Sequence, residues 1–149
     1  MKKVKLYTDG ACSGNPGQGG WGAVIIYKDS IRKISGYSPE TTNNIMELTA
    51  VIEGIGMLKE RCEIDVYTDS KYIVDAVNEW LANWIRNGWI TSAKKPVKNV
   101  SYWKSIIELS EKHNIKWHWV KGHDGNTYNE ECDRMAREEI VRNRKGGSL

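Results

Sequence analysis

The chain has 149 residues and a net charge of +3, and its 40% hydrophobic and 28% charged residues exclude a disordered chain and suit one domain. Its longest apolar stretch, Ala23–Tyr27, is far shorter than the roughly 20 residues of a membrane-spanning helix, and no apolar block of signal-peptide length follows Met1. Three cysteines without Cys-x-x-Cys spacing favour a reducing compartment, so we expect a soluble protein of the cytoplasm.

The first third of the chain predicts a three-stranded antiparallel meander. Side chains alternate between apolar and polar over Val4–Asp9, which is typical of a half-buried strand. The Gly, Asn and Pro cluster at Gly10–Gly20 is expected to end that strand. Two runs rich in β-branched and aromatic residues, Trp21–Tyr27 and Ile31–Tyr37, predict the next two strands.

The remainder of the chain alternates between helical and strand patterns. An apolar stripe predicts an amphipathic helix from Asn44 to about Leu58. The further elements in chain order are a strand at Ile64–Thr68, a helix at Tyr72–Trp84, a helix at Ser101–His113, a strand at Ile115–Val120 and a helix from Thr127 to about Arg142.

This order predicts an α/β fold with a mixed five-stranded sheet, in which three strands are antiparallel and two are parallel, flanked by helices. A right-handed helical crossover brings the fourth strand parallel to the first. We expect one domain at residues 1–142 and a flexible tail at 143–149, which contains Arg144, Lys145 and two glycines.

A short sequence pattern, Tyr-Thr-Asp, occurs twice, at the carboxyl ends of two of these strands. Tyr7-Thr8-Asp9-Gly10 closes the first strand and Tyr67-Thr68-Asp69-Ser70 closes the fourth. In neighbouring parallel strands the two aspartates would lie roughly 5 Å apart. Two carboxylates about 4 Å apart repel by about 4 kcal/mol at an effective dielectric near 20, so they require a proton or a cation, and Mg²⁺ is the natural oxygen-bound cation. Alternatively, each aspartate caps the turn that follows it.

Two more acids extend this cluster. Glu47 shares a helical row with Ala50, Val51 and Gly54, which predicts that it faces the sheet, where an acid is costly to bury without a cation or a donor. Asp133 flanks the apolar stripe of the last helix. Taken singly, each could be an ordinary surface acid in a salt bridge.

A basic, tryptophan-rich segment lies between Trp80 and Ile107. It contains five Lys and Arg residues, no Asp or Glu, and four of the seven tryptophans. Such a segment can hold phosphates and offer flat faces to sugars or bases. It can equally be a solvated basic surface whose tryptophans lie in the core.

At these residues the sequence resembles type I ribonuclease H of the bacterial kind, from Lys3 to about Arg142. The motifs that carry the resemblance are Tyr7-Thr8-Asp9-Gly10 with Cys12-Ser13-Gly14-Asn15-Pro16-Gly17, Thr41-Thr42-Asn43-Asn44-Ile45-Met46-Glu47-Leu48, Thr68-Asp69-Ser70, Lys94-Lys95-Pro96-Val97-Lys98-Asn99, Trp117-His118-Trp119-Val120-Lys121-Gly122-His123, and Asn129-Glu130 with Cys132-Asp133.

The resemblance implies the ribonuclease H fold and an endonuclease that hydrolyses the RNA strand of an RNA/DNA hybrid by a two-metal-ion mechanism, leaving 5′-phosphate and 3′-hydroxyl ends. It implies that two Mg²⁺ ions, which Mn²⁺ can replace, bind at Asp9, Glu47, Asp69 and Asp133. It also implies that His123 assists proton transfer or product departure.

The resemblance further implies a monomer whose partner is the hybrid. The expected substrate contacts are Cys12, Asn15, Asn43 and Asn44 along the minor groove, Trp80 and Trp103 on sugars, and Thr42 and Asn83 at a DNA phosphate. Two departures leave alternatives open: the basic segment carries few charges for this family, and Glu40 stands where an arginine often helps bind phosphate. The alternatives are a hybrid-binding module without turnover and another carboxylate nuclease on the same fold.

Overall fold

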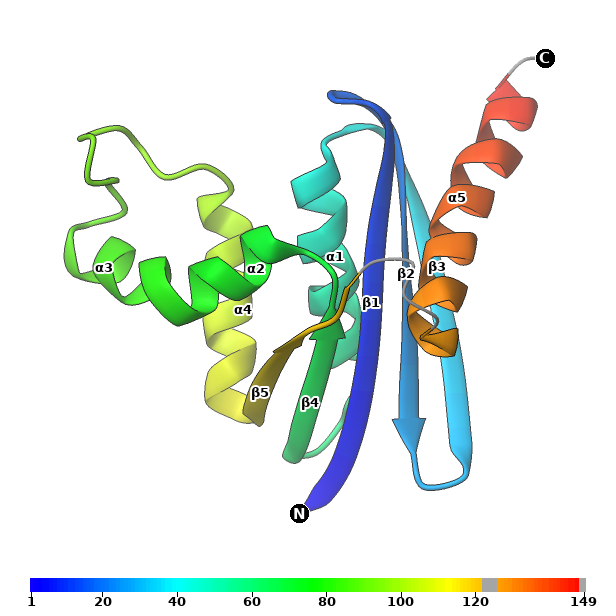
Figure 1. Cartoon of the computed structure of the whole chain (residues 1–149), viewed down its shortest axis with the longest axis horizontal. Helices are drawn as coiled ribbons and strands as arrows, with labels where there is room; N and C mark the ends of the chain where they lie inside the picture. The colour runs from blue at the N-terminus through cyan, green and yellow to red at the C-terminus, as the bar shows by residue number, and fades with distance from the viewer. Residues whose placement is uncertain (122–125, 148–149) are drawn as a thin grey trace.

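The computed structural model describes residues 1–121 and 126–147, in which five strands form one mixed sheet flanked by helices (Figure 1). The strands are β1 (Lys2–Gly14), β2 (Gly17–Tyr27), β3 (Ser30–Thr41), β4 (Cys62–Thr68) and β5 (Asn114–Trp119), in the spatial order β3-β2-β1-β4-β5. β1 to β3 pair antiparallel, whereas β4 lies parallel to both β1 and β5. The predicted fold class and the pairing of the first strand with the fourth are confirmed.

The helices cover both faces of this sheet. They are α1 (Asn43–Gly56), α2 (Lys71–Asp75), the π-helical segment η1 (Ala76–Trp80), α3 (Leu81–Arg86), α4 (Val100–Lys112) and α5 (Thr127–Gly147). Adjacent residues of a strand point to opposite faces. Accordingly, Leu6 joins a core cluster with residues of α1 and α4, while Tyr7 joins a second cluster with Cys132 and Met135 of α5. No described helix is long and apolar enough to cross a bilayer.

The prediction that the first strand ends at Gly10 is wrong. β1 continues to Gly14 and β2 begins at Gly17, and the two strands pair along this whole length. Backbone hydrogen bonds need no side chain, so glycines can occupy a ladder where another element approaches closely. A Cβ on Gly20 would lie 2.1 Å from the carbonyl oxygen of Ala136 in α5, which shows what these glycines make room for.

Two predicted helices differ from the structure in their bounds. The single helix predicted over Tyr72–Trp84 is instead α2, η1 and α3 in succession, with a π-helical segment between the two α-helical ones. α5 continues to Gly147, five residues past the predicted end at Arg142. The predicted flexibility of 143–149 concerns motion, so it stays a prediction.

Candidate active site

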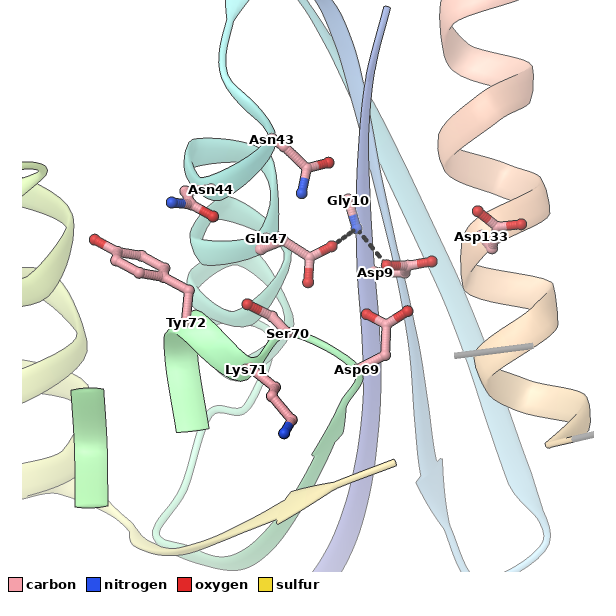
Figure 2. Close-up of a pocket in the computed structure, with 10 residues that line it drawn as sticks. All are labelled: Asp9, Gly10, Asn43, Asn44, Glu47, Asp69, Ser70, Lys71, Tyr72 and Asp133. Carbon is pink, nitrogen blue, oxygen red and sulfur yellow. Dashed lines mark hydrogen bonds between the residues drawn. The ribbon is translucent and has the colours of Figure 1, made fainter. Parts of the chain in front are cut away.

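The site lies where β1 extends past the end of its neighbour β4. The last residue pair between these strands is Thr8 with Thr68, so Asp9 is the first β1 residue without a β4 partner. Asp69 follows directly at the point where the chain leaves β4 for α2. The Asp9 side chain is only 6% exposed, and both aspartates line one pocket of about 400 Å³ (Figure 2).

Helix α1 brings Glu47 to this sheet edge. Thr42 caps the helix, because its Oγ1 accepts a hydrogen bond from the backbone N–H of Ile45 at 3.2 Å. A Cβ on Gly10 would lie 2.6 Å from the backbone nitrogen of Glu47, so only glycine lets α1 approach β1 this closely. The Gly10 N–H donates to both Asp9 Oδ1, at 2.9 Å, and Glu47 Oε1 (Figure 2).

Helix α5 brings Asp133 to the same pocket from the opposite face of the sheet (Figure 2). Arg137 Nε donates to Asp133 Oδ2 at 3.0 Å from one turn further along the helix. Glu47 and Asp133 therefore line the same pocket from opposite faces of the sheet, beyond the end of β4.

Three of these carboxylates form a tight group. One ligand oxygen from each of Asp9, Glu47 and Asp69 lies within 4.8 Å of the others. Burial raises the pKa of Asp9 to about 7, opposed by its hydrogen bond with Glu47 and reinforced by the charges of Asp69 and Asp133. Burial, together with the charge of Asp9, also raises the pKa of Glu47 well above its usual range. The folded chain thus holds negative charge at a place that disfavours it.

The donor atoms of this group fit a hard divalent cation. Glu47 is 3% exposed, and its Oε2 is buried with no hydrogen-bond partner among the described residues. A buried carboxylate oxygen without a donor is costly, and a cation would satisfy it. The described residues place no Lys or Arg in an ion pair with Asp9, Glu47 or Asp69. Oxygen-only ligands suit Mg²⁺ or Mn²⁺ better than softer metals.

Polar residues predicted to contact substrate adjoin this pocket. Asn43 and Asn44, at the start of α1, line the pocket with the acids (Figure 2). Asn15 Oδ1, in the β1–β2 turn, accepts from the Asn43 N–H at 3.0 Å. Cys12 is half-buried and its Sγ lies 3.4 Å from the carbonyl oxygen of Thr41, next to the helix cap Thr42. The turn and the start of α1 therefore form a continuous polar rim.

The tryptophan-rich segment divides into exposed and buried residues. Trp80 is 39% exposed and Asn83 is exposed, so both are available to a ligand. Trp103 is 0% exposed, and its Nε1 donates to the Tyr72 hydroxyl at 3.0 Å. The expectation that Trp103 contacts a sugar is therefore corrected: its ring lies in the core against the rings of Tyr72 in α2 and Trp84 in α3, as the alternative interpretation of this segment held.

One residue predicted for the site is not described, and one residue of the pocket was not predicted. His123 lies outside the described residues. Lys71 was missed, although it lines the same pocket from the first position of α2. Its place two residues after Asp69 was the available signal, since the start of a helix that follows a strand end lies at the same sheet edge.

Comparisons with known proteins agree with this geometry. The family model for RNase H matches residues 1–141. The chain is 56% identical over 141 residues to a ribonuclease H of Chlorobium luteolum, covering 94% of this chain and 97% of that relative. It is 50% identical over 147 residues to a ribonuclease H of Brucella anthropi, covering 99% and 96%. It is also similar to the crystal structure of LC9-RNase H1, a type 1 RNase H with the type 2 active-site motif, at 30% identity and a TM-score of 0.84, covering 95% of this chain and 73% of that one.

Proposed function

The chain belongs to the ribonuclease H family, and from this premise we propose that it is an endonuclease that hydrolyses the RNA strand of RNA/DNA hybrids. The observation that carries the proposal is the pocket lined by Asp9, Glu47, Asp69 and Asp133. The products we propose carry 5′-phosphate and 3′-hydroxyl ends.

The four acids are the proposed ligands of two Mg²⁺ ions, which Mn²⁺ can replace. When bound, such cations activate water and stabilise the charge that develops on a phosphate under attack. Asp9 and Glu47 supply the buried side of the site, and Asp69 and Asp133 the more exposed side. The Gly10 N–H fixes one oxygen of each buried acid, which leaves the buried Glu47 Oε2 free for a cation.

The arrangement also explains how a metal site can be prepared before metal arrives. The sheet edge and two helices hold the acids together despite their burial, which raises the pKa of Asp9 and Glu47, and despite the mutual repulsion that adds to it. Binding of divalent cations relieves this repulsion, so part of the binding free energy comes from strain already present in the fold.

Selection of RNA is assigned to the polar rim beside the acids. Asn43 and Asn44 line the pocket, and Asn15 is hydrogen-bonded to the backbone of Asn43. Amide side chains can both donate and accept, as recognition of a 2′-hydroxyl requires. We assign Cys12 to the same polar rim, and Thr42, Trp80 and Asn83 to contacts with the DNA strand.

One experiment tests this function. The protein is incubated with labelled RNA/DNA hybrid, duplex RNA and duplex DNA, with Mg²⁺ or with chelator. We expect cleavage of the RNA strand of the hybrid only, dependent on the metal, and a loss of at least about 100-fold in Asp69→Asn. Metal-independent hybrid binding without product would indicate a binding module, and equal cleavage of duplex DNA would indicate a different nuclease.

The proposed role of His123 needs its own variant. His123→Ala should lower the rate of product formation while leaving Mg²⁺ binding by the four acids unchanged, because its role is to move a proton or aid product departure. An equal loss of metal affinity would contradict that role.

A further inference from the structure

Trp119, at the end of β5, lies beside the acidic pocket with an exposed ring. It is 45% exposed, one of the largest apolar side chains on the described surface. The next residue fixes this strand end in place, because the Val120 N–H donates to the Thr68 carbonyl at 2.9 Å. The Trp119 Nε1–H in turn donates to the main-chain carbonyl of Asp69 at 3.3 Å.

The same ring holds the ammonium group of Lys71. Lys71 Nζ lies 5.1 Å from the centre of the Trp119 ring, a cation–π contact. Lys71 lines the pocket of the acids, yet its side chain points away from Asp9, Glu47 and Asp69 (Figure 2). The ammonium group of Lys71, the one Lys or Arg among the described residues that line the pocket, is thus held outside the cluster.

The position of the Lys71 ammonium is informative, because electrostatic attraction to the acids favours a position inside the pocket. Among the described residues, no Lys or Arg pairs with the three clustered acids. A lysine two residues from Asp69, on a flexible four-carbon stem, would gain attraction by turning its ammonium inward. There it would occupy the space of a divalent cation.

We propose that Trp119 is a positioning residue that holds the Lys71 ammonium outside the acidic pocket and so prevents it from competing with divalent cations. The inference rests on the proposed function, because it assumes that the acids bind metal. It assigns to Trp119 and Lys71 a part in metal affinity, although neither is a metal ligand.

The test is a double-mutant cycle on Mg²⁺ binding, measured by isothermal titration calorimetry of the full chain without nucleic acid. Trp119→Leu removes both the ring and the indole N–H, whereas Trp119→Phe keeps an aromatic face and loses only the N–H. An exposed cation–π contact of about 0.5–1 kcal/mol corresponds to a two- to fivefold change in a binding constant. We therefore expect Trp119→Leu to weaken Mg²⁺ binding by about two- to fivefold and Trp119→Phe to stay within twofold of the unaltered protein.

The decisive arm is rescue by a second substitution. In the Trp119→Leu background, Lys71→Gln should restore Mg²⁺ affinity, by a larger factor than Lys71→Gln changes it in the unaltered protein. If Trp119 acted only by holding the Asp69 backbone, removing the lysine would restore nothing. Lys104→Gln is the matched control, since Lys104 lies 5.8 Å over the ring of Trp89 in the tryptophan-rich segment, and it should show no such coupling.

The results distinguish a failure of this inference from a failure of the proposed nuclease function. Unchanged Mg²⁺ affinity in Trp119→Leu, or weakened affinity that Lys71→Gln does not restore, would overturn the inference while hybrid cleavage persists. Failure of the unaltered protein to bind Mg²⁺, or binding that Asp69→Asn leaves intact, would overturn the proposed function as well. Unfolding of each variant without metal shows whether it is folded. Should Trp119→Leu be unfolded, Trp119→Gln, which also removes the aromatic face, repeats the test, with the same loss of Mg²⁺ affinity and the same rescue by Lys71→Gln expected.

Discussion

Asp9 faces Gly22 across the β1–β2 pairing, and this glycine sets how closely α5 approaches the acidic pocket. A Cβ at position 22 would lie 2.6 Å from the carbonyl oxygen of Cys132, the residue before Asp133. Gly10 does the same for α1 on the other face, as described above. Two glycines beside one aspartate thus control the distance of both helices that supply acids.

We expect Gly22→Ala to displace α5 and move Asp133 away from the pocket. The overpacking should lower the free energy of unfolding by about 1–3 kcal/mol. Misplacement of one ligand should lower the hybrid-cleavage rate about 10- to 100-fold. Chemical denaturation and steady-state kinetics measure the two effects.

The matched control is Gly56→Ala at the end of α1, where a Cβ meets nothing within 4 Å. This variant should be neutral or more stable by up to about 1 kcal/mol, with full activity. Equal behaviour of the two variants would contradict the role given to Gly22.

Without metal, the stability of the protein should depend on the ionisation of Asp9. Its pKa is raised in the folded state to about 7. The stability that the protein has while the Asp9 carboxyl is protonated is therefore fully present below pH 3.8, the ordinary pKa of this group. It is lost as the pH rises through about 7, where the buried carboxyl becomes charged. Asp9→Asn should accordingly be more stable than the unaltered protein at pH 7.5, by about 1–3 kcal/mol, with little difference at pH 4.

Thermal unfolding in the presence of chelator measures this difference. Added Mg²⁺ should stabilise the unaltered protein more than Asp9→Asn and so narrow the gap. A variant less stable than the unaltered protein at both pH values would contradict the electrostatic account of the site.

His113, which lies beside the first residue of β4 and so at the end of that strand opposite to the acidic pocket, predicts a pH dependence of stability with the opposite sign. Its buried Nδ1 accepts from the Cys62 N–H at 3.1 Å, and burial, with help from Arg61 and Lys112, lowers its pKa. This stability is present above the ordinary pKa of 6.5 and is lost as the pH falls below that value toward the lowered folded pKa.

His113→Ala should therefore cost about 1–3 kcal/mol at pH 7.5, because the buried Cys62 N–H loses its acceptor. The cost should shrink at pH 5, where the histidine of the unaltered protein must lose its proton to fold. Urea denaturation at the two pH values measures it, and a cost that grows at pH 5 would show the sign to be wrong.

Trp103 and Trp80 should behave as residues of different kinds. Trp103→Phe removes a buried donor to the Tyr72 hydroxyl and should destabilise the fold by about 1–2 kcal/mol without changing the KM for hybrid. Trp80→Ala should raise the KM for hybrid and leave stability within about 0.5 kcal/mol. The reverse pattern would restore Trp103 as a substrate contact.

The sequence alone was enough to predict the elements whose signal is local. The alternation of Val4–Asp9, the helical stripe around Leu48 and the echo of Asp9 in Asp69 indicated the strand, the helix and the parallel pairing that the structure contains. The burial of Glu47 was predicted because helical periodicity places it on the same face as the small and apolar residues Ala50, Val51 and Gly54.

The tertiary structure alone decided features that depend on which elements approach one another. The glycines of β1 and β2 resemble a loop in the sequence because a strand position occupied by glycine has no side-chain period to detect. Trp103 is as compatible with a surface as with a core until the fold places the rings of Tyr72 and Trp84 against it. The contact of Lys71 with Trp119 joins residues 48 positions apart, and only closure of β5 onto β4 brings their side chains together. Local patterns record the periodicity of the backbone, whereas such long-range contacts form only when the whole sheet has assembled.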